Sequence, residues 1–159
     1  MARQRAATNR NDPEKNAGAR MYGEYIMAGA CGLGARQLTR AEDVVERGLA
    51  GLGTDIVMLI DDVGNILLRR GESRFGHALH SLAALAAANF SAMGAMARIL
   101  GEEGFSMLLY KGERENLQVC QVTEELMLVA VFGPRASLGA LRLGLDSAIH
   151  ELRYVLEDG

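Results

Sequence analysis

The stretch Asp55-Ile-Val-Met-Leu-Ile-Asp-Asp-Val-Gly-Asn-Ile-Leu-Leu-Arg-Arg70 contains two apolar runs of strand length. Between them lies Asp61-Asp-Val-Gly64, whose aspartates and glycine favour a turn. Two such runs joined by a short turn predict a β-hairpin with strands at 55–60 and 65–70. We therefore expect an antiparallel sheet to begin here.

A helix is expected before this hairpin. Thr39 and Glu42 have the spacing of a capping box, in which each side chain bonds a free backbone amide at the helix start. Five residues behind them share one helical face: Val44, Val45, Gly48, Leu49 and Leu52. Gly53 then ends the predicted helix.

A long helix is expected after the hairpin, over residues 77–100, and Gly101 ends it. One stripe along this helix has the usual apolar spacing: Leu79, Leu82, Ala86, Phe90, Met93 and Ala97. Much of the remaining surface carries small residues: Ala83, Ala84, Ala87, Ala88, Ser91 and Ala95. A helix over a sheet needs one apolar face, so this one packs against its sheet and against something else, or lies deeply buried within one chain.

Three more strands are expected at 105–110, 117–122 and 126–132, joined by loops short enough to require antiparallel neighbours. A last helix begins at Ser137 and carries apolar residues at helical spacing to Leu156. The predicted fold is α+β, with elements in the order helix, two strands, helix, three strands, helix. A five-stranded antiparallel sheet with helices covering its faces satisfies this order.

The composition fits one globular domain: of 159 residues, 49% are hydrophobic and 23% charged. We expect a flexible basic N-terminal extension at 1–37 and the folded domain at 38–159. Residues 1–36 carry net charge +3 and the remainder −6, so the domain is a poor electrostatic match for nucleic acid.

Two further observations concern the compartment. Cys31 and Cys120 cannot form a disulfide framework, which favours a reducing, cytoplasmic location. The apolar stretch 78–97 includes His80, Ser81 and Asn89, so a packed helix is expected there, not a membrane span.

No constellation of residues predicts chemistry. His77 and His80 lack a third ligand at suitable spacing, so no metal is expected. Residues 29–34 are glycine-rich, but no strand precedes them, and a GxxxxGK[ST] motif is absent from the sequence. We expect no cofactor and no active site, and we expect the function to lie in surfaces.

Three segments resemble a known family. They are residues 59–67 in the hairpin, residues 88–102 with Asn89-Phe-Ser-Ala-Met-Gly94, and residues 128–143 with Arg135-Ala-Ser-Leu-Gly139. Together they resemble the roadblock/dynein-light-chain superfamily, and within it the bacterial MglB-type regulators of Ras-like GTPases. The resemblance extends from about residue 38 to 156.

This resemblance implies a homodimer in which two sheets join into one of ten strands. It places five residues at the dimer interface: Ala84, Ala87, Phe105, Met107 and Leu109. It also implies that two chains bind one GTP-loaded, Ras-like (MglA-type) small GTPase and remodel it so that GTP hydrolysis accelerates. The expected GTPase-binding residues are Ala88, Ser91, Ala92, Ala95 and Arg98.

Two alternatives remain open from the sequence. One is a roadblock scaffold that binds a GTPase or a polarity complex without activating it, and the other is a small-molecule sensory domain of related architecture. For an activator that supplies its own arginine finger, five residues are candidates: Arg69, Arg70, Arg74, Arg98 and Arg135. A role in cell polarity or motility is implied by the resemblance alone.

Overall fold

The computed structural model describes residues 32–71 and 74–157. The elements follow in the order α2 (Ala35–Leu49), β1 (Thr54–Asp61), β2 (Ile66–Gly71), α3 (Ala78–Ile99), β3 (Met107–Lys111), β4 (Asn116–Gln121), β5 (Leu126–Phe132) and α4 (Leu138–Glu157). The five strands form one antiparallel sheet in the order β2-β1-β5-β4-β3. The predicted fold class is therefore confirmed. The extension at 1–37 lies largely outside the described residues, and the boundary at 38 stays a prediction.

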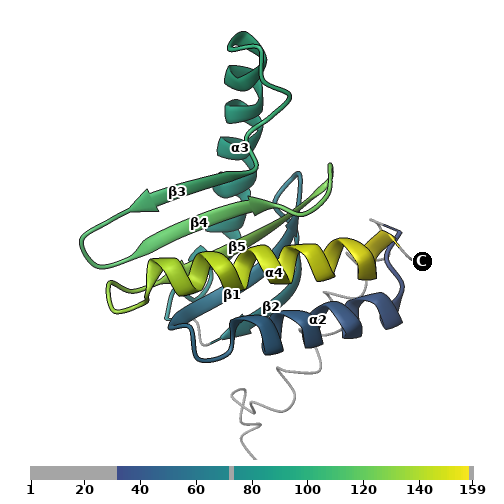
Figure 1. The fold of residues 1–159 in the computed structure, drawn as a ribbon, viewed down its shortest axis with the longest axis vertical. Helices are drawn as coiled ribbons and strands as arrows, with labels where there is room; N and C mark the ends of the chain where they lie inside the picture. Colours follow the sequence, from purple (N-terminus) through teal and green to yellow (C-terminus); the bar gives the residue numbers. More distant parts are fainter. Residues whose placement is uncertain (1–31, 72–73, 158–159) are drawn as a thin grey trace, which may run out of the picture.

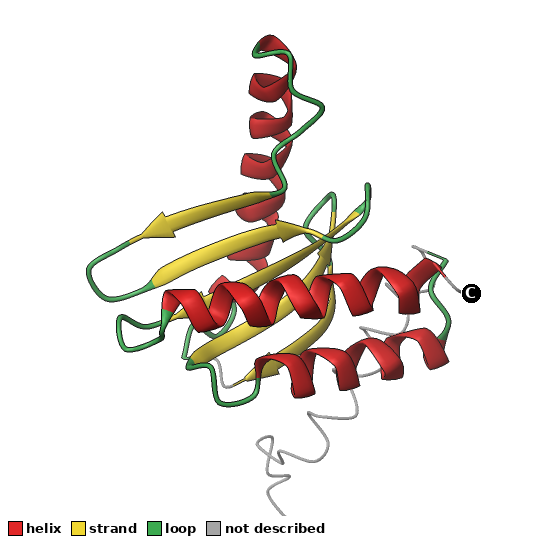
Figure 2. Ribbon diagram, viewed as in Figure 1, coloured by secondary structure: helices red, strands yellow, loops and turns green. Residues whose placement is uncertain are grey.

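The sheet lies between two helical layers. α2 and α4 run side by side across one face, and α3 crosses the opposite face (Figures 1 and 2). Alternation along β5 divides the core accordingly, because successive side chains point to opposite faces. Leu128, Ala130 and Phe132 pack under α2 and α4, whereas Val129 and Val131 pack under α3.

α2 starts earlier than predicted, at Ala35. The Gly34 amide donates to Gln37 Oε1 at 2.8 Å, while Thr39 Oγ1 donates to the Ala35 carbonyl inside the helix at 3.1 Å. The predicted capping box from Thr39 to Glu42 is therefore wrong. Gln37 also donates through Nε2 to the Leu156 carbonyl at 3.1 Å, and this bond ties the start of α2 to the end of α4.

The last helix begins as expected. The Ser137 carbonyl accepts the Leu141 amide at 2.9 Å, and Ser137 Oγ accepts the Ala140 amide at 3.4 Å. A serine in this position satisfies backbone donors that have no partner within the helix. The predicted start of α4 is confirmed.

Candidate functional site

The two halves of α3 have different surroundings. Its first half lies against the sheet, where Leu79, Ala83 and Ala86 are buried. Its second half projects past β3, beyond the edge of the sheet (Figure 1). Ala97 is buried there, whereas the side chains of Ile99 and Leu100 are 85% and 69% exposed. An exposed apolar helix of this kind marks an interaction surface.

Two exposed stripes run along α3, side by side. Residues three and four apart share a helical face. We call the first the small stripe, and it consists of Ala84, Ala88, Ser91, Ala95 and Arg98. We call the second the large stripe, and it consists of Leu85, Asn89, Ala92, Met96 and Ile99. All ten residues are exposed.

The expected GTPase-binding residues fall mainly on one stripe. Four of the five lie on the small stripe, and the exception, Ala92, lies on the adjacent large stripe. Ala84, which was expected at the dimer interface, also lies on the small stripe. Ala87 is 2% exposed and packs with the core between α3 and the sheet. Its own chain therefore already covers the Ala87 side chain.

β3 is an edge strand whose described partner is β4. Leu109 faces the α4 side of the sheet and Tyr110 faces the α3 side, and both are exposed. Met107 is half-buried, with its sulfur 2.7 Å from Gln118 Nε2, and Phe105 before the strand is also half-buried. An edge with backbone groups free to pair and apolar side chains beside them is suited to strand pairing with another chain.

The turn between β1 and β2 touches α3. Asp61 Oδ1 accepts the Val63 and Asn65 amides at 3.1 and 2.7 Å, and Asp61 Oδ2 accepts Asn65 Nδ2 at 2.7 Å. Gly64 has φ +91°, and a Cβ added to it would overlap the backbone of Ala84. The turn is therefore held tightly against the helix, with Val63 exposed beside it. The sequence pattern predicted a turn here but not its contact with the small stripe.

Two of the five candidate arginine fingers are engaged in ion pairs. Arg70 contacts Glu42 at 3.2 Å and Glu46 at 3.5 Å, and Arg74 pairs with Glu115. For the other three no ion pair is seen among residues 32–71 and 74–157: Arg69, Arg98 and Arg135. Arg98 is the candidate that lies on a stripe of α3.

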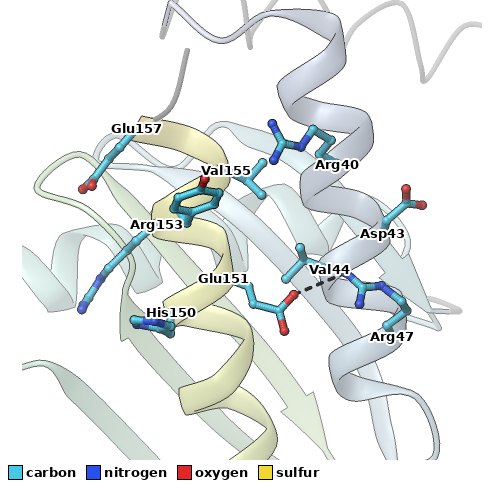
Figure 3. A pocket seen from close by; sticks show the side chains of 10 residues that line it. Arg40, Asp43, Val44, Arg47, His150, Glu151, Arg153, Val155 and Glu157 are labelled. Carbon is cyan, nitrogen blue, oxygen red and sulfur yellow. Dashed lines mark hydrogen bonds and ion pairs between the residues drawn. The ribbon is translucent and has the colours of Figure 1, made fainter.

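A hollow of about 610 Å³ lies between α2 and α4, on the face of the sheet away from α3 (Figure 3). Val44 and Val155 line it together with charged side chains of both signs, including Arg40 and Asp43. An ion pair between Arg47 and Glu151, at 3.3 Å, joins its two walls. The lining carries charges of both signs, so it does not favour a ligand of one charge.

Metal binding and membrane insertion are the two other possibilities for the described part of the chain. No group of three or more His, Cys, Asp or Glu side chains there could hold a metal ion. By length and composition alone, α3 is long and apolar enough to cross a membrane. Of its most apolar 18-residue segment, 22% is buried within the protein. The same composition suits a helix that other protein surfaces cover.

Comparisons with known proteins agree with this architecture. A search of the curated proteins finds no match. Myxococcus xanthus MglB is 30% identical, with TM-score 0.71, over 76% of this chain and 90% of that one. The gliding protein MglB of Thermus thermophilus is 34% identical, with TM-score 0.72, over 79% and 94%.

A further solved structure, of an MglB with a tetrameric arrangement, is 34% identical with TM-score 0.71, over 79% of this chain and 93% of that one. The family model for the Roadblock/LC7 domain matches residues 41–132, which include β1 to β5 and α3. The chain therefore belongs to the Roadblock/LC7 domain family, among its MglB-type members.

Proposed function

We propose that two copies of this chain form a homodimer that binds a GTP-loaded Ras-like small GTPase and accelerates GTP hydrolysis. The observation that carries the proposal is the projecting half of α3, which extends past the sheet edge with Met96 and Ile99 exposed. A second copy joined at the β3 edge would place its own sheet against this half. The MglB-type relatives support this assignment, because the family resemblance implies a dimer joined through the long helix, α3, and the strand that follows it, β3.

The large stripe and the β3 edge are the surfaces that we assign to the second copy. Leu85, Met96 and Ile99 give the large stripe long apolar side chains, which gain most from leaving water. β3 would pair with its copy, so that its edge is no longer exposed. The small stripe, with alanine and serine in place of long side chains, would then remain accessible to the GTPase.

Acceleration is assigned to a population shift in the GTPase. A regulator that binds the hydrolysis-competent conformation more tightly than other conformations increases its population. The GTPase's own residues then reach the nucleotide, and no group of this chain has to enter the site. This proposal is consistent with two of the candidate arginines, Arg70 and Arg74, being held in ion pairs.

The test is single-turnover GTP hydrolysis by the Ras-like GTPase encoded in the same genome, with this protein titrated from none to several-fold excess. We expect stimulation that saturates near two chains per GTPase. Ala95→Arg should abolish both binding and stimulation, because a long charged side chain would block the small stripe. The mass of the assembly should be unchanged in this variant.

Each outcome separates one candidate function from another. Binding without stimulation would identify a scaffold. A monomeric Ala95→Arg protein would mean that the small stripe belongs to the dimer interface. No binding by the unsubstituted chain would overturn the GTPase assignment and leave the sensory-domain alternative. Arg98→Ala tests whether Arg98 is an arginine finger, because loss of an arginine finger lowers the rate of GTP hydrolysis by about 10³–10⁵ while sparing binding.

A further inference from the structure

We infer that the β1–β2 turn is a second part of the GTPase-docking surface and that Val63 is its apolar contact. This inference rests on the proposed function, because it names a residue of the same site. It assigns Val63 a role that the sequence pattern, a polar turn between two strands, does not suggest.

The turn is held rigidly by its own hydrogen bonds. Three bonds to the Asp61 carboxylate fix the amides of Val63 and Asn65 and the Asn65 side chain. Asp61 is 5% exposed, and the three bonds are partly buried. A turn fixed in this way loses little conformational entropy when a partner binds it.

The turn is also attached to α3. Gly64 lies so close to Ala83 and Ala84 that its backbone and the helix backbone are in direct contact. The turn and the small stripe therefore form one continuous surface, because Ala84 is the first residue of that stripe. A partner lying along Ala84 and Ala88 would reach the turn without any movement of either element.

The exposed side chain of Val63 gives this surface an apolar contact. Val63 is 67% exposed, although β-branched apolar residues are uncommon at turns. The turn belongs to the β2–β1 side of the sheet, whereas β3 forms the opposite edge. We assign the second copy to the β3 edge and the large stripe, whereas the turn contacts Ala84 of the small stripe, so the GTPase is the occupant to which we assign Val63.

The experiment measures binding of the same GTPase, loaded with a non-hydrolysable GTP analogue, to the full chain and to Val63→Glu. We expect the Kd to rise at least tenfold in Val63→Glu, because a carboxylate would be buried without a partner. Leu143→Glu is the matched control: Leu143 is 73% exposed on α4, on the other face of the sheet, and its Kd should be unchanged. Both variants should keep the assembly mass and the unfolding midpoint of the unsubstituted chain.

The outcomes distinguish this inference from the proposed function. An unchanged Kd in Val63→Glu, together with loss of binding in Ala95→Arg, would overturn the role of the turn and leave the proposed function in place. A lower assembly mass in Val63→Glu would assign the turn to the second copy and also overturn the inference. If the unsubstituted chain shows no binding, both proposals fail together.

Discussion

Cys120 lies in the core between the sheet and α4, with its sulfur 3.5 Å from Gln118 Nε2. Burial raises the pKa of the Cys120 thiol from 9.0 to about 11, opposed by the Gln118 hydrogen bond and assisted by the charge of Asp146. A thiol that stays protonated is a weak nucleophile. Cys120 therefore acts as a small core residue.

The raised pKa predicts a pH dependence of stability. Between pH 9 and 11 the thiol ionises in the unfolded chain but stays protonated in the folded one. The free energy of unfolding should therefore fall as pH rises through this window, by up to about 2–3 kcal/mol. Urea unfolding of a Cys31→Ser protein, compared with Cys31→Ser/Cys120→Ala over the same pH range, measures this contribution. Parallel pH profiles would contradict the prediction.

Two neighbouring alanines of α3, Ala87 and Ala88, differ in burial in a way that their residue type does not reveal. Ala87 and Ala88 are neighbours of the same type in the same helix, and the family resemblance implied a second copy as the partner of one and the GTPase as the partner of the other. The structure buries Ala87 in the core of its own chain and leaves Ala88 exposed. The predicted apolar stripe did locate the inward face of α3: Leu79, Ala86 and Ala97 are buried, and Leu82, Phe90 and Met93 are half-buried. Spacing did not show that Ala87, beside this stripe, also lies against the sheet.

At the scale of elements, α2 and α4 pack with their backbones unusually close. Gly48 and Gly144 lie at their contact: a Cβ added at Gly144 would lie 3.0 Å from the Gly48 carbonyl oxygen, and one at Gly48 would lie 3.2 Å from Ala148 Cβ. Glycine at both positions lets the helices approach. α2 also packs against β2, and its Val45 and Leu49 reach the core.

Gly144→Leu should destabilise the fold by about 1–3 kcal/mol, because the new side chain has no space between the two helices. Gly139→Leu is the control on the same helix, since a Cβ there points into space that none of the described residues occupies. Its better helix propensity should leave stability unchanged or raised by up to about 1 kcal/mol. Urea denaturation of both variants at one protein concentration checks the difference. Equal unfolding midpoints would mean that the close approach of α2 and α4 does not contribute to stability.

The elements themselves were largely predictable. Residues 126–132 were expected as a strand and form β5 with the same bounds, because their β-branched and apolar residues lie between clear turns. The start of α2 was not predictable from the Thr39–Glu42 pattern. Gln37 provides the reciprocal bond to Gly34 and also bonds Leu156, and that second partner is 119 residues away in the sequence.

At the scale of the whole molecule, the proposed dimer predicts a native mass of twice the 17.1 kDa of the chain. Ile99→Glu should shift the assembly toward the monomer, because it places a charge on the most exposed apolar residue of the large stripe. Leu143→Glu, on the outward side of α4, should leave the mass unchanged. Light scattering after size exclusion measures the native mass of the unsubstituted chain and of the Ile99→Glu and Leu143→Glu variants. A dimeric Ile99→Glu protein would remove the large stripe from the proposed interface.

The sequence by itself determined the elements, their order and the antiparallel sheet, because periodicity and turn residues act over short distances along the chain. It also indicated that the long helix serves more than its own core. Only the tertiary structure decided that Ala87 is buried while Ala88 is exposed, how far α3 projects past β3, and that the turn at Val63 lies beside Ala84. These features depend on contacts between residues far apart in the sequence, which local patterns do not encode.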